Sequence, residues 1–202
     1  MIRSNITLNR EYTVGKTDER LFGSFIEHIG RAVYGGIYEP EHPEADEAGF
    51  RKDVAEAVRA LLDRGTDVAM PVLGDVSLFA SSAYVAQLLE EEGCRCVRVP
   101  GVPSFCAAAA RLGRSLTEMD LPVHIVPAGG FPLEEALDLP GTKVLMKSGR
   151  ALPQVLEALE SRGLLESSAM VQNCGLPGEK ICRSLDEASD DISYFTTIII
   201  KE

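Results

Sequence analysis

The sequence predicts a layered α/β fold built on a mostly parallel or mixed sheet. Short apolar or β-branched runs alternate with segments whose apolar residues recur every three to four positions, and glycine or proline separates them. With 202 residues, 45% of them hydrophobic, the chain is long enough to bury one large core or two small ones. Strands that alternate with helices are typical of sheets covered by helices.

Composition excludes several classes of partner. The formal net charge of -11 argues against nucleic acid and against an anionic membrane surface, because phosphate binding needs a basic face. No apolar run is long enough to span a bilayer, and MIRSNITLNREY lacks the apolar core of a signal peptide, so we expect a cytoplasmic protein. The five cysteines are scattered without zinc spacing, since Cys94-x-Cys96 is too tight, and we therefore predict no metal site.

The N-terminal fifty residues differ from the rest of the chain. The run ITLNREYTV, residues Ile6 to Val14, predicts a strand. The stretch from Gly35 to Gly49 is dense in glycine, proline and acidic residues, and such breakers predict irregular structure.

The middle of the chain begins with a strong helix. From Phe50 onward apolar residues recur at helical spacing until Gly65, which ends the helix. The expected elements that follow are a buried strand (67–73), a helix (81–93), a short strand (96–99) and an alanine-rich helix (104–112).

The same alternation continues to the C-terminus. Its expected elements are a strand (124–126), a helical turn (133–137), a strand (143–146), an amphipathic helix (152–162), a strand (168–171) and a β-branched strand (194–201).

Three breaks at strand ends are candidate ligand sites. They are Leu73-Gly74-Asp75, the run from Pro100 to Ser104, and the run from Met146 to Arg150. Ligands of open α/β sheets settle outside the carboxyl ends of strands, where glycine lets backbone amides come close. Taken singly, each break is better interpreted as an ordinary strand-to-helix turn.

In order and with their flanks, these motifs resemble a known family. PVLGDVSLFASSAYVAQLLEEEGCRCVRVPGVPSFCAAAARLG, KVLMKSGR, VQNCGLPGEKI and SYFTTIIIKE are similar to the tetrapyrrole methylases from about Val54 to Glu202. VPGVPSFCAAAARLG and VLMKSGR fit the precorrin-2 (cobalt-factor II) C20-methyltransferases within that family. The resemblance implies a homodimeric two-domain enzyme of cobalamin synthesis. It would hold S-adenosylmethionine between its domains and methylate a tetrapyrrole, precorrin-2 or cobalt-factor II.

The resemblance also implies site residues, although it identifies no catalytic one. The implied cofactor contacts are Leu73, Gly74, Asp75, Leu78, Pro103, Ser104, Met146 and Gly175. Arg111 and Arg150 are the candidates for pairing with substrate carboxylates. The Asp75 carboxylate has two interpretations, as an acceptor for the cofactor or as a cap for its own turn. The chain departs from the family at Val76, where proline is usual, and at Pro103, where a hydroxyl residue is common.

Residues 6–53 resemble a different family. LFGSFIEHIGRAVYGGIYEPEHPEADEAGFRKDV is similar to the start of intracellular α-L-arabinofuranosidases, in which Glu27 would contact the sugar. Retaining hydrolysis needs two carboxylates ~5–5.5 Å apart, and these have no counterpart in the sequence. The chain therefore reads as a junction of two unrelated gene pieces between about Phe50 and Leu62.

The predicted fold is a tetrapyrrole-methylase-like layered α/β sheet with an incomplete first domain and a foreign N-terminal strand-and-loop segment. We expect a hydrolase-like segment (1–53), the remainder of a cofactor-side domain (54–112) and a second α/β domain (113–202). The family's G-x-G-x-G-D opening is not found, which predicts impaired methyl transfer. Two alternatives stay open: an inactive fragment of an arabinofuranosidase fusion, or a non-catalytic α/β binding module.

Overall fold

A computed structural model describes residues 37–188 and 193–201. The chain forms two compact units, unit 1 (Met1–Pro100) and unit 2 (Gly101–Glu202). The predicted strand 6–14 and Glu27 lie outside the described residues. The predicted domain limits at residues 53 and 112 stay a prediction. Within the described ranges, no helix is long and apolar enough to cross a membrane.

The described part of unit 1 packs an irregular loop on two helices. The loop, residues 37–51, is held by isolated bridges that pair Tyr38 with Phe50 and Ala45 with Arg51. Helices α2 (Lys52–Leu62) and α3 (Ser82–Glu91) follow. A small core joins the three pieces through Ile37, Ala55, Val85 and Leu89. The expected irregular loop and both expected helices are therefore confirmed.

Two predicted strands of unit 1 are wrong. Residues 67–73 and 96–99 carry no strand pairing in the described chain. A strand needs a hydrogen-bonded neighbour, and an apolar run supplies only one of the two partners. The consequence is visible at Val97 and Val99, whose exposed fractions are 70% and 71%.

Unit 2 is a five-stranded mixed sheet covered by helices. Its helical elements are α4 (Ser104–Leu112), α5 (Leu133–Leu137), the 3-10 turn η2 (Gly149–Ala151), α6 (Leu152–Ser161) and the 3-10 turn η3 (Leu185–Glu187). Its strands are β1 (Val123–Pro127), β2 (Thr142–Met146), β3 (Ser168–Gln172), β4 (Lys180–Cys182) and β5 (Thr196–Ile200). The spatial order is β1-β2-β5-β3-β4, parallel only between β1 and β2. The mixed sheet confirms the predicted fold class, whereas β4 was not predicted.

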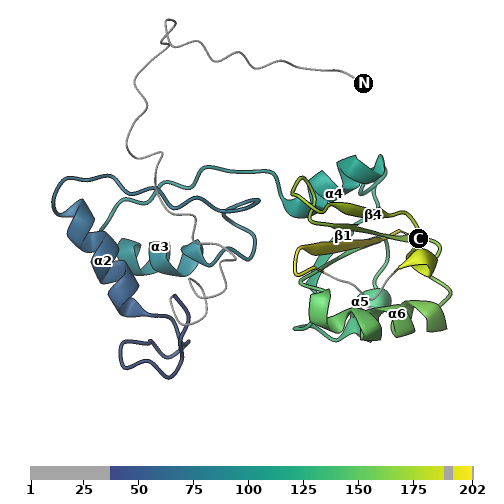
Figure 1. Cartoon of the computed structure of the whole chain (residues 1–202), viewed down its shortest axis with the longest axis horizontal. Coiled ribbons are helices and arrows are strands. Elements are labelled where there is room, and N and C mark those ends of the chain that lie inside the picture. The colour runs from purple at the N-terminus through teal and green to yellow at the C-terminus, as the bar shows by residue number, and fades with distance from the viewer. Residues whose placement is uncertain (1–36, 189–192, 202) are drawn as a thin grey trace, which may run out of the picture. The chain divides into compact units, whose positions relative to one another are not determined.

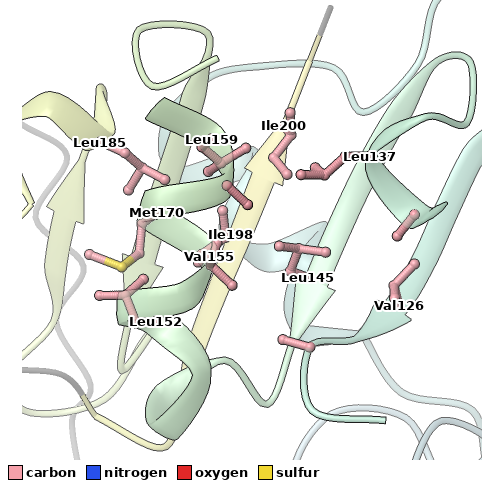
Figure 2. Packing of buried hydrophobic residues seen from close by; sticks show 13 residues of the cluster. Val126, Leu137, Leu145, Leu152, Val155, Leu159, Met170, Leu185, Ile198 and Ile200 are labelled. Carbon is pink, nitrogen blue, oxygen red and sulfur yellow. The ribbon is translucent and has the colours of Figure 1, made fainter. Parts of the chain in front are cut away.

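The core of unit 2 lies between the sheet and α6. Helix α4 covers one face of the sheet, whereas α5 and α6 lie on the other (Figure 1). Figure 2 shows α6 presenting Leu152, Val155 and Leu159 to Leu145 and Ile198 of the sheet. All five of these side chains are at most 1% exposed, and each contributes about 1.5–3 kcal/mol by burial.

The topology brings several turns to one edge of the sheet. Strands β1, β2 and β3 run in the same direction, because β2 and β3 are both antiparallel to β5. Their carboxyl ends therefore meet at one edge, which also receives the chain entering β5. This edge is where an α/β sheet binds ligands.

Candidate functional site

The turn after β2 combines backbone strain with an unsatisfied polar group. Met146 ends the strand and is half-buried, and Lys147 follows with φ of 57°. A left-handed conformation costs a non-glycine residue about 1–2 kcal/mol, and such strain gathers at functional sites. Ser148 is fully buried, and its Oγ has no hydrogen-bond partner among the described residues. An unpaired buried hydroxyl is costly, so an acceptor reaching this turn would be stabilised.

The turn after β3 shows the same strain and is tied to β5. Asn173 has φ of 48°. Its Nδ2 donates to the carbonyl of Gly178 at 3.2 Å, and its Oδ1 accepts from the Ser193 hydroxyl at 2.6 Å. A Cβ on Gly149 would lie 3.5 Å from the Ser193 carbonyl oxygen. The turns after β2 and β3 therefore lie against the same short segment that leads into β5.

Gly175 and Arg111 are connected through a residue that the sequence analysis did not select. The Gly175 amide donates to a Glu179 carboxylate oxygen at 2.7 Å. The same carboxylate accepts from the Arg111 Nε at 3.0 and 3.1 Å and from its Nη2. The Arg111 guanidinium, together with the Gly175 amide, holds the pKa of Glu179 below its usual value. The Nε and Nη2 donors of Arg111 therefore bind Glu179, which lies 68 residues away in the chain.

The other implied residues of unit 2 lie around α4 and η2. Pro103 is the N-cap residue of α4, and its carbonyl accepts from the amides of Cys106 and Ala107 at 3.0 and 3.1 Å. Ser104 begins the helix and is half-buried. Ser104 and Arg111 are seven residues apart, which is about 10 Å along the axis. Arg150 lies in η2, directly after the strained turn.

The four implied residues of unit 1 form a tight bend. Leu73 is 41% exposed, and Gly74 has φ of 97°. The Asp75 Oδ1 accepts from the Ser77 amide at 2.9 Å and from the Ser77 hydroxyl, while the Leu78 amide donates to the Asp75 carbonyl at 3.2 Å. Asp75 therefore caps its own turn, as one of its two interpretations expected. The cofactor role of Asp75 stays a prediction.

The structure groups the site differently from the sequence. It brings Met146 and Gly175 to one edge of the unit 2 sheet. It adds Asn173, which the sequence did not indicate as a site residue, and it gives features of their own to Lys147 and Ser148, which lie in the predicted run 146–150. Asn173 had a usable signal, because asparagine before a Cys-Gly turn tolerates left-handed backbone.

An open depression of about 560 Å³ along α6 contains none of the predicted site residues. No cluster of three metal-ligating side chains occurs within the described ranges.

The N-terminal part of the chain is similar to arabinofuranosidases. It is 57% identical over 61 residues to an intracellular exo-α-(1→5)-L-arabinofuranosidase of Bacillus subtilis, and 59% identical over 58 residues to an exo-α-(1→6)-L-arabinofuranosidase of Bifidobacterium longum. These matches cover 30% and 29% of this chain, but only 12% and 11% of those enzymes. The resemblance of this segment is confirmed, and the chain spans a small fraction of those relatives.

Solved structures share the fold of about three-quarters of the chain. A cobalt precorrin-4 methyltransferase is 26% identical with a TM-score of 0.65, and the match covers 77% of this chain and 72% of that one. A uroporphyrin-III C-methyltransferase of Thermus thermophilus, solved with S-adenosylhomocysteine, superposes with a TM-score of 0.55 at 22% identity, covering 75% and 74%. The predicted methylase-like architecture is thereby confirmed.

The sequence comparisons establish the family. A cobalt-precorrin-2 C(20)-methyltransferase of Salmonella typhimurium is 33% identical over 164 residues, which cover 78% of this chain and 68% of that enzyme. The family model of the tetrapyrrole (corrin/porphyrin) methylases matches residues 15–188, starting before the Val54 limit that the motifs indicated. The chain belongs to the tetrapyrrole methylase family.

Proposed function

We propose that this protein transfers the methyl group of S-adenosylmethionine to C20 of precorrin-2 or of its cobalt-containing form. The observation that carries the proposal is the 33% identity with the Salmonella enzyme, whose own length is 68% covered. The phrases VPGVPSFCAAAARLG and VLMKSGR support the same substrate position. We also propose a homodimer, which sedimentation equilibrium tests.

The residues at the edge of the unit 2 sheet fit the cofactor. Met146 offers a half-buried apolar surface. The buried Ser148 hydroxyl has no hydrogen-bond partner among the described residues and could donate to a ligand atom. Adenosine carries both a flat apolar face and several acceptor atoms. In unit 1, Leu73, Gly74, Asp75 and Leu78 form a bend, and we propose that it contacts the methionine and ribose part.

The proposed chemistry asks little of individual side chains. When bound, S-adenosylmethionine supplies a methyl group already activated on a sulfonium, and the tetrapyrrole offers an electron-rich ring carbon. The protein residues orient the two reactants and exclude water, which lowers the entropic part of the barrier. A set of turns and apolar contacts can supply this orientation. The reaction leaves S-adenosylhomocysteine and the proton that the methylated substrate loses.

Calorimetry with S-adenosylhomocysteine tests the cofactor half of the proposal. The full chain should bind one equivalent. Asp75→Asn, which keeps an oxygen for the Ser77 amide and removes the charge, should weaken binding, and Asp75→Ala should weaken it further. The exposed Asp120 provides a control, because Asp120→Ala should leave affinity unchanged. No heat from a folded wild-type sample refutes the proposal.

Methyl transfer tests the substrate half. Label from methyl-labelled S-adenosylmethionine should appear at C20 when precorrin-2 or its cobalt form is supplied. Label at another ring carbon would support methyl transfer as the reaction and refute C20 as the position.

The match to arabinofuranosidases covers only 12% and 11% of the Bacillus and Bifidobacterium enzymes, and we propose no hydrolase activity from it.

A further inference from the structure

The carboxylate of Glu179 holds two parts of unit 2 together. It accepts from the Gly175 amide at 2.7 Å and from the Arg111 guanidinium, with Nε at 3.0 and 3.1 Å from its two oxygens. The Glu179 side chain is 14% exposed, whereas that of Arg111 is 56% exposed. The partly buried member of the pair is therefore the one that fixes the loop, and the exposed member neutralises its charge.

The turn after β3 is thus held at both ends. Asn173 fixes its start through the Gly178 carbonyl and the Ser193 hydroxyl. Glu179 fixes its end through Arg111 of α4, a helix that packs on β3 and β5. The residues between them, including Gly175, are exposed or half-exposed at the edge of the sheet. Without Arg111, the Glu179 carboxylate would carry an uncompensated charge in a partly buried place and would turn towards solvent, which releases the Gly175 amide.

We infer that Arg111 is a positioning residue that, through Glu179, fixes the turn after β3 in the conformation that receives the ligand. This inference rests on the proposed function, because the ligand is the cofactor of the proposed reaction. It assigns Arg111 a role different from the predicted pairing with substrate carboxylates. When a turn holds its competent conformation for only a fifth of the time, the apparent dissociation constant rises about fivefold.

The experiment compares variants of the full chain in two measurements. The first is hydrogen exchange of the Gly175 amide without ligand, and the second is affinity for S-adenosylhomocysteine. The variants are Arg111→Gln, Arg111→Lys, Glu179→Ala and the double variant Arg111→Gln/Glu179→Ala. Arg98→Gln is the matched control, because Arg98 forms a similar exposed two-point pair with Glu90 in unit 1.

We expect Arg111→Gln and Glu179→Ala each to speed exchange at Gly175 and to weaken binding about fivefold. The double variant should be no weaker than either single one, Arg111→Lys should recover part of the loss, and Arg98→Gln should match the wild type. Unchanged exchange or unchanged affinity in Arg111→Gln overturns the inference. So does a double variant whose loss is the product of the single losses, since Arg111 would then act on the ligand directly.

If the wild type itself does not bind S-adenosylhomocysteine, the proposed function is refuted, but the positioning role of Arg111 is not. In that case, faster Gly175 exchange in Arg111→Gln still supports the positioning of the turn, and unchanged exchange overturns it.

Discussion

Replacing Gly141 by alanine should destabilise unit 2, because this glycine lies where β1 and β2 begin to pair. Gly141 has φ of 84°. A Cβ there would come closer to the Pro122 carbonyl oxygen than real Cβ atoms do, and would lie 2.9 Å from the Pro122 Cδ. That oxygen accepts from the Thr142 amide at 3.0 Å, at the start of β2. It therefore cannot move away without breaking the first link between the strands.

The magnitude has two parts, which a second glycine separates. A left-handed conformation costs alanine about 1–2 kcal/mol relative to glycine. Forcing a methyl group into occupied space costs about 1–3 kcal/mol more. Gly163 has φ of 66°, and a Cβ there would meet nothing within 4 Å. Gly141→Ala should thus lose about 2–5 kcal/mol and Gly163→Ala about 1–2 kcal/mol.

Urea unfolding followed by far-UV circular dichroism, together with amide exchange of Val144 and Leu145, measures both variants. Val144 and Leu145 are fully buried in β2, so their exchange reports the opening of the sheet. Equal losses in the two variants would refute the reasoning, because the contact with Pro122 would then contribute nothing.

Three further predictions concern the junction and the site. Phe50→Ala should lower the free energy of unfolding of unit 1 by about 2 kcal/mol, because Phe50 is half-buried and stacks on the Tyr84 ring of α3 at a centroid distance of 3.6 Å. Faster amide exchange in α3 checks this prediction. Ser148→Ala should leave the urea midpoint unchanged or raised, since the hydroxyl is unpaired, and should weaken S-adenosylhomocysteine about three- to tenfold in calorimetry. Arg111 and the Gly175 amide lower the pKa of Glu179, so the stabilisation from this carboxylate is complete above the unfolded-state pKa of about 4.3 and is lost as the pH falls through the lower folded-state pKa. Gly175 exchange, corrected for its intrinsic pH dependence, should rise in that acidic range, and a flat profile would contradict the prediction.

Local pattern was sufficient for most of unit 2. Helix α4 was predicted over its observed range, Ser104–Leu112, because its apolar spacing and the glycine that follows it are both local signals. The β-branched run that forms β5 was recognised for the same reason. Strand β4 was missed, since Lys180–Cys182 is a short and largely exposed edge strand with no alternation to recognise.

The family and the layered α/β class were determined by the sequence alone, because both depend on the order and spacing of residues along the chain. Only the tertiary structure decided which extended segments become strands. Residues 67–73 and 96–99 have strand-like composition, yet pairing depends on a neighbour that composition does not supply. It also decided the strain at Lys147 and Asn173 and the partner of Arg111. The pairing of Arg111 with Glu179 joins residues that are 68 positions apart in the chain, and no local pattern in the sequence records it.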